Sequence, residues 1–145
     1  MTQTTTGQNI FRTRTTLSQA DIFALDTTPV NLVPAIPGKS IALIGFFETY
    51  LYGTATYTTT GAVAQVRYGS VSGGSQPLGT TELVTSLISA KAVSQFKTVD
   101  PASVAAVALT TVKGLGLFLI ATTTGFAATG GDGSIEIDVE YQVIP

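Results

Sequence analysis

Residues 133–145 read Gly-Ser-Ile-Glu-Ile-Asp-Val-Glu-Tyr-Gln-Val-Ile-Pro. From residue 135 to residue 143, every second side chain is β-branched or aromatic, and the positions between them carry Glu136, Asp138, Glu140 and Gln142. Because successive side chains of a strand point to opposite faces, this alternation predicts a half-buried strand with one apolar face and one acidic face. Residues 130–133 (Gly-Gly-Asp-Gly) have the composition of a turn, since glycine and aspartate tolerate positive φ. The sequence therefore predicts a β scaffold.

The longest strand candidate spans residues 39–52, and apolar side chains occupy both of its faces. Such a strand is expected at the centre of a sheet that is covered on two sides. Gly45 lies inside it and predicts a bulge. Strict alternation over the whole stretch assigns one face to Ile41, Leu43, Phe47 and Leu51, and the other to Ala42, Ile44, Phe46, Tyr50 and Tyr52.

The other apolar segments are short and are separated by glycine, proline and threonine. Prolines on both sides restrict residues 30–33 to a short or edge strand, and residues 22–25 form a short apolar segment. Further strands are expected at residues 10–17, 62–68, 92–99, 104–112 and 115–122, with loops at 53–61, 70–79 and 123–133.

One short helix is expected at residues 81–90, where the apolar side chains fall on a single stripe. Seven or eight short strands with one helix predict an all-β domain, an antiparallel β-sandwich or jelly roll, over residues 10–145. Residues 1–9 are polar and are expected to form an N-terminal arm.

The most informative feature of the composition is its low charge. Charged residues make up 11% of the 145 residues, against about 25% in typical soluble domains, and threonine, serine and glycine take their place. Surface charge usually keeps a concentrated monomer apart from its neighbours. A surface of hydroxyl groups and small side chains loses its water more easily than a charged surface. The composition therefore predicts a protein that is part of a permanent assembly.

The same composition excludes several partners. The net charge is −2 and the sequence pI is about 4.8, which does not suit a nucleic-acid surface. The N-terminus lacks the basic start and apolar run of a signal peptide, and the longest apolar run, within residues 115–121, is too short to span a membrane. We expect a soluble product made in the cytoplasm, with no nucleic-acid or membrane partner.

Histidine and cysteine are absent from the sequence. Catalysis by Ser-His-Asp or Cys-His and zinc binding through nitrogen and sulfur ligands are therefore excluded, and no cofactor is expected. The stretch Gly38-Lys39-Ser40 resembles the end of a phosphate-binding loop, but Val33 stands where that motif needs its first glycine, and a strand follows in place of a helix.

The acidic row Glu136, Asp138 and Glu140 is the best candidate for a site. Neighbours on one face of a strand lie about 6.5–7 Å apart, which is too wide for one cation to bridge all three carboxylates. The spacing could suit the acid–base pair of an inverting glycosidase, but exposed charge rows are usually solvated or ion-paired structural faces. Arg12 and Arg14 form a complementary basic row, and we expect the two terminal strands to pair within or between subunits.

Several stretches taken together resemble a group of small structural proteins of tailed bacteriophages that decorate, or cement, capsids. They are residues 33–41 (Val-Pro-Ala-Ile-Pro-Gly-Lys-Ser-Ile), 52–54 (Tyr-Gly-Thr), 66–69 (Val-Arg-Tyr-Gly), 130–135 (Gly-Gly-Asp-Gly-Ser-Ile) and 139–144 (Val-Glu-Tyr-Gln-Val-Ile). The resemblance covers roughly residues 30–145 and includes no catalytic motif; similar patterns occur in virion and tail proteins.

The resemblance implies a β-sandwich homo-oligomer, dimer or trimer, on the outer surface of a phage capsid, where it would bridge adjacent major capsid subunits. Such a protein needs no chemistry, only a rigid scaffold and many weak contacts multiplied by symmetry. Aromatic side chains are frequent interface anchors. The candidate interface residues are Phe11, Tyr52, Tyr57 and Phe126, together with Arg12, Arg14, Glu136, Asp138 and Glu140.

Two other classes of function stay open at this point. The first is a carbohydrate-binding jelly roll on a phage tail or adhesin, although most of the aromatic residues fall in predicted strands and the acids form a row on one strand. The second is an enzyme, a glycosidase in particular, whose activity would depend on Glu136.

Overall fold

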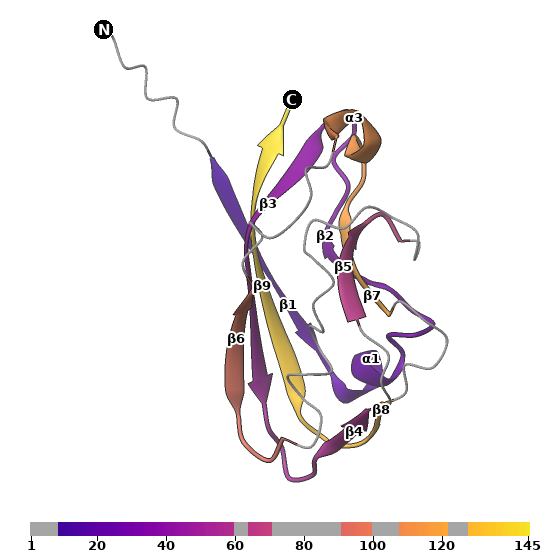
Figure 1. Cartoon of the computed structure of the whole chain (residues 1–145), viewed down its shortest axis with the longest axis vertical. Coiled ribbons are helices and arrows are strands. Elements are labelled where there is room, and N and C mark those ends of the chain that lie inside the picture. Colours follow the sequence, from indigo (N-terminus) through magenta and orange to yellow (C-terminus); the bar gives the residue numbers. More distant parts are fainter. Residues whose placement is uncertain (1–8, 60–63, 71–90, 100–107, 122–127) are drawn as a thin grey trace, which may run out of the picture.

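The computed structural model describes residues 9–59, 64–70, 91–99, 108–121 and 128–145 (Figure 1). The strands in this part of the chain are β1 (Ile10–Leu17), β2 (Val30–Val33), β3 (Ser40–Leu51), β4 (Tyr57–Thr59), β5 (Ala64–Tyr68), β6 (Gln95–Val99), β7 (Leu117–Ala121), β8 (Ala128–Gly130) and β9 (Ser134–Ile144). The helices are α1 (Gln19–Phe23) and α3 (Leu109–Val112).

All strand pairs in these residues are antiparallel. One sheet has four strands in the order β1-β9-β3-β6, a second has three in the order β2-β7-β5, and β4 pairs with β8. The two larger sheets stand opposite each other, as Figure 1 shows, and one core cluster contains buried side chains from both. The prediction of an all-β, sandwich-like single domain is confirmed.

The C-terminal strand lies inside the four-stranded sheet, between β1 and β3. Its residues 135, 137 and 139 are apolar and fully buried, as the alternation predicted. β9 pairs with β1 over the whole length of that strand, from Ile10 opposite Gln142 to Leu17 opposite Ile135. The predicted strand at residues 10–17 is thus confirmed, and the two ends of the described chain meet in one sheet.

The bulge predicted at Gly45 is also confirmed, because the register between β3 and β9 shifts between Leu43 and Gly45. The bulge reverses the faces of the strand. Ile41 is buried before it, whereas Phe46 and Tyr50 are buried after it. The predicted assignment of faces, which assumed uninterrupted alternation, was therefore wrong beyond Gly45, because one extra residue changes the phase of every later side chain.

The reversed phase also places Glu48 in the interior. Its side chain is 0% exposed, and its backbone partners are Ile137 on β9 and Lys97 on β6. Two hydroxyl groups tie the sheets together across the same interior: Tyr68 donates to the carbonyl oxygen of Ile41 at 2.5 Å, and Thr13 donates to a carbonyl of β2 at 3.1 Å.

Short local elements account for most of the differences from the sequence prediction. Residues 109–112, expected to continue a strand, form α3, where the Thr111 N–H donates to the Ala108 carbonyl within one turn. The strands β4 and β8 have three residues each and lie in segments predicted as loops. The predicted helix at 81–90 lies outside the described residues, as do the first eight residues of the arm and residues 104–107 of the predicted strand.

The apolar segment at residues 22–25 follows a well-capped helix start. Ser18 and Asp21 form a capping box, in which the Ser18 N–H donates to the Asp21 carboxylate at 2.8 Å and the Ser18 hydroxyl accepts from the Asp21 N–H. This box orients α1 so that Ile22 enters the core.

At the end of the sandwich beside β4 and β8, the Asp132 carboxylate links two loops by hydrogen bonds. Asp132 accepts hydrogen bonds from the Thr54 N–H at 2.7 Å, the Thr54 hydroxyl at 2.6 Å and the Ala55 N–H at 2.9 Å. These bonds lower the pKa of Asp132, the Thr54 hydroxyl contributing most. The turn predicted at residues 130–133 thus holds the β3–β4 connection in place.

Candidate interaction surface

The outward face of the four-stranded sheet carries the charged residues that the sequence singled out. The register places Arg12 opposite Glu140 and Arg14 opposite Asp138 on β9. Alternation sends all four side chains to the face that points away from the second sheet. The basic and acidic rows therefore meet within one chain, which is one of the two pairings expected from the sequence.

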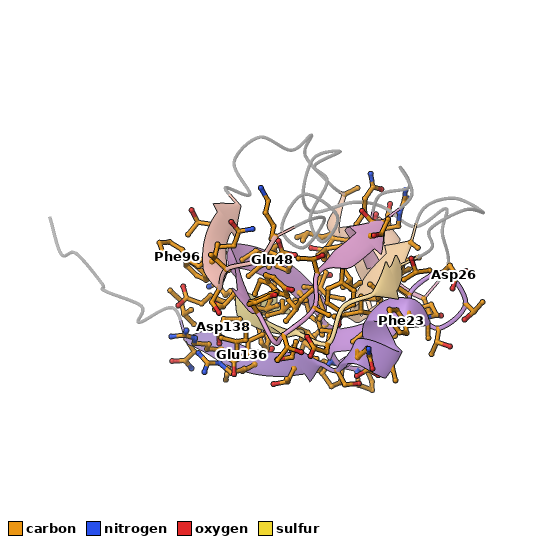
Figure 2. The ribbon with its side chains drawn as sticks, turned by 90° about the horizontal axis from the view of Figure 1, so that it is seen from below. Phe23, Asp26, Glu48, Phe96, Glu136 and Asp138 are labelled. Carbon is orange, nitrogen blue, oxygen red and sulfur yellow. The ribbon has the colours of Figure 1, made fainter. Side chains whose placement is uncertain are left out.

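Asp138 is the centre of this contact. Arg14 donates to it through Nε at 2.9 Å and through Nη2 at 2.8 Å, while Arg12 adds contacts at 3.3 Å from Nε and 3.2 Å from Nη2. Arg14 also reaches Glu136, with Nη1 at 3.4 Å from a carboxylate oxygen. We call these four residues the ion-pair ladder, and Figure 2 shows its two acids together beside β1.

The central carboxylate of the ladder is much less exposed than the two arginines that contact it. The Asp138 side chain is 10% exposed, whereas those of Arg12 and Arg14 are 56% and 55% exposed. The hydrogen bond from Arg14 is the main reason that the pKa of Asp138 is lowered, and burial acts against it only in part. The general acid of a glycosidase needs a raised pKa, whereas the pKa of Asp138 is lowered, so Asp138 does not suit that role.

Glu140 stands apart from the ladder. It has no ion pair among the described residues, and its carboxylate lies over Gly45, so that a β-carbon at residue 45 would approach it to 3.2 Å. The bulge glycine thus leaves room for this carboxylate on the boundary between β9 and β3.

A row of apolar side chains continues the same face beyond the ladder. Phe47 and Leu51 on β3 are 37% and 41% exposed, and Phe96 on β6 is 78% exposed. Their register partners on the neighbouring strands, Asp138, Ser134 and Thr49 respectively, are outward-facing positions. We call these three residues the apolar strip; in Figure 2 Phe96 lies at the margin of the molecule and Glu48 in its interior.

Sequence reasoning did not identify the apolar strip. Uninterrupted alternation assigned Phe47 and Leu51 to the same face as the buried Ile41, and it treated the second face as covered as well. The available signal was the bulge at Gly45, since a single inserted residue exchanges the two faces. Phe96 lies on a predicted strand, but its exposure depends on the position of β6 at the edge of the four strands described for this sheet.

The aromatic candidates occupy different environments. Phe11 is exposed and stacks on Tyr141 of β9, with ring centroids 5.6 Å apart and an angle of 26° between the rings. Tyr52 is partly buried, and its hydroxyl donates to the Thr54 carbonyl at 2.9 Å. Phe126 lies outside the described residues.

Tyr57 belongs to the core. It is fully buried, and its hydroxyl donates to the Gly133 carbonyl at 2.6 Å. Desolvation is the main cause that raises its pKa to about 12, with smaller contributions from Tyr50 and Asp132. A side chain in this position supports the scaffold and is not accessible to a partner, so the structure does not bring it together with the ladder or the apolar strip.

The described residues contain no group of three or more aspartate or glutamate side chains placed to hold a metal ion. Within the same ranges, no helix is long and apolar enough to cross a membrane.

Comparison with known proteins gives no relative for this chain: no family model matches it, and neither does any curated protein or solved structure.

Proposed function

We propose that this chain is a structural virion protein that binds the outer surface of a bacteriophage capsid and stabilises it by bridging adjacent major capsid subunits. The observation that carries the proposal is the exposure of many large apolar side chains on a chain with only 11% charged residues. They include the apolar strip, Ile10 and Phe11 on β1, and Leu109 and Leu115 near α3.

This distribution supports adhesion. Large apolar side chains that are exposed near one another, as in the apolar strip, mark sites of contact with other proteins. Each contact can be weak, because a symmetric shell presents the same site many times and multivalent attachment multiplies the affinities. The sandwich supplies a rigid frame for such contacts, with its sheets linked by hydrogen bonds from the Thr13 and Tyr68 hydroxyl groups.

The charges also favour a binding role over a catalytic one. The ladder uses Asp138 and Glu136 to satisfy two arginines, so these carboxylates act as acceptors in ion pairs. A carbohydrate-binding role would need exposed aromatic rings beside polar groups on loops, whereas the exposed ring of Phe96 lies on a strand.

The test uses capsids of the phage whose genome encodes the chain, assembled without this protein. Purified full-length chain is added, and we expect it to sediment with the capsids at a fixed ratio to the major capsid protein and to raise their melting temperature. Capsids of an unrelated phage serve as the control. The proposal fails if the chain does not bind its own capsids at any concentration, or if it binds them without any gain in thermal or osmotic resistance.

A further inference from the structure

The outward face of the four-stranded sheet combines two features that are seldom left in water together. The apolar strip exposes two phenylalanines and a leucine around Thr49: Phe96 on β6 lies opposite Thr49, and Phe47 and Leu51 lie two residues to either side of it on β3. Next to it, the ladder holds its charges in mutual contacts on β1 and β9. Two β-sheets can pack face to face through apolar side chains, as the inner faces of a sandwich do.

We propose that this face is a self-association surface, on which two copies of the chain pack sheet against sheet around a two-fold axis. The apolar strip, on β3 and β6, forms the apolar half of the contact, and the ion-pair ladder and Glu140, on β1 and β9, form its polar half. A two-fold interface uses the same surface on both copies, so the surface must be compatible with itself.

The size of the face fits a dimer. A strand residue covers about 16 Å² of sheet, from a rise of about 3.3 Å and a strand spacing of about 4.8 Å. Strands of 8, 11, 12 and 5 residues therefore present a flat area of roughly 570 Å². Specific interfaces start at about 600 Å² per partner, and side-chain relief adds to the flat area.

The electrostatics of the face also fit a second copy. Because both arginines of the ladder already contact Asp138, and Arg14 contacts Glu136, the ladder has two positive and two negative groups. The ladder itself is therefore neutral, and Glu140, which has no ion pair among the described residues, leaves the face with a single net negative charge, so a second copy is only weakly repelled. The half-exposed guanidinium groups stay at the rim, where polar contacts tolerate water.

Pairing through β1 is less favourable. Among the strands that the structure describes, β1 is an edge strand of eight residues, and two copies could extend the sheet through it. An antiparallel pairing centred near Thr13 would place Arg12 of one copy opposite Arg14 of the other. Like charges directly opposite each other on neighbouring strands are destabilising, so the arginines protect this edge and leave the face as the route to a dimer.

The first test measures the oligomeric state of the full chain by sedimentation velocity, from low to several hundred micromolar, with the variants Phe96→Glu and Leu109→Glu. Both replaced side chains are apolar and exposed, but Leu109 lies on α3, away from the apolar strip (Figure 1). We expect a wild-type dimer whose Kd rises about tenfold or more in Phe96→Glu, as for an aromatic interface anchor, and is unchanged in Leu109→Glu.

The second test locates the contact. Since the chain has no cysteine, single cysteines can be introduced at Thr49, in the middle of the face, and at the exposed Thr111 on α3. A short bis-maleimide should link two copies through residue 49 and leave the residue 111 variant without a covalent link between copies. Circular dichroism checks that each variant keeps its β-structure.

Three results would overturn the inference: a wild-type chain that stays monomeric over the whole concentration range, an oligomer that Phe96→Glu leaves intact, or an oligomer that Leu109→Glu disrupts equally. Because both tests are carried out without capsids, their outcome is separate from that of the proposed function. If the chain is a dimer that does not bind capsids, only the proposed capsid role is refuted. If it is a monomer that binds capsids, only this inference is refuted.

Discussion

Two buried tyrosines that pack against each other differ in what their hydroxyl groups contact. The rings of Tyr50 and Tyr57 lie 6.2 Å apart, and both side chains are fully buried. The Tyr57 hydroxyl donates to the Gly133 carbonyl, while the Tyr50 hydroxyl has no hydrogen-bond partner among the described residues. A buried hydroxyl contributes stability only where it is paired, because burial removes its bonds to water.

This contrast gives the first prediction. Tyr57→Phe should lower the free energy of unfolding by about 1–2 kcal/mol, because it removes a paired donor and leaves the Gly133 carbonyl without it. Tyr50→Phe should be neutral within about 0.5 kcal/mol or slightly stabilising, since it removes an unpaired hydroxyl and keeps the ring. Urea unfolding of both variants measures the difference. Equal losses in the two variants would contradict this view of the core.

At the scale of elements, the pairing of β1 with β9 depends on one carboxylate that serves two arginines. Asp138→Asn removes the charge and keeps the size of the side chain. We expect it to cost about 1 kcal/mol of stability, less than a fully buried pair, because the ends of Arg12 and Arg14 are more than half exposed. The loss should shrink in high salt, since salt screens exposed charges.

Glu140→Gln is the matched control for this change. Glu140 lies on the same strand and face but has no ion pair among the described residues, so its neutralisation should leave the thermal melting temperature almost unchanged. If the two variants melt alike, the ladder makes no specific contribution to the pairing of β1 with β9.

Elements differ in how well they could be predicted. β1 and β9 follow from alternation alone, because each is regular from end to end and needs no information from its neighbours. The position of the bulge in β3 could be predicted from Gly45, but its effect on the faces was missed. The strands β4 and β8 could not be predicted, because three residues carry too little pattern and their pairing joins segments about seventy residues apart in sequence.

At the scale of the whole molecule, the pH dependence of stability follows from its acids. Hydrogen bonds lower the pKa values of Asp21, Asp132 and Asp138, and the main donors are Ser18, Thr54 and Arg14 respectively. A carboxyl group whose pKa is lower in the folded state than in the unfolded state stabilises the fold at pH values above its unfolded pKa. That stability is lost as the pH falls through the folded value.

We therefore expect the free energy of unfolding to change little from about pH 8 to pH 5 and to fall below about pH 4, where unfolded aspartate begins to bind protons. The absence of histidine removes the usual titration between those limits. Urea unfolding across this range measures the curve. Asp138→Asn should flatten its acidic part, and a steep loss already between pH 7 and pH 5.5 would contradict the assignment.

The amino-acid sequence by itself determined that this is an all-β chain with a regular strand near each end, a bulge at Gly45 and few charges, because alternation, glycine positions and composition are local properties. Only the tertiary structure decided which face of β3 meets the core, that the two charged rows pair within one chain, and that Tyr57 is interior while Phe96 is not. Those outcomes depend on strand order and register, which join residues far apart in the sequence and are selected by the packing of the whole sandwich.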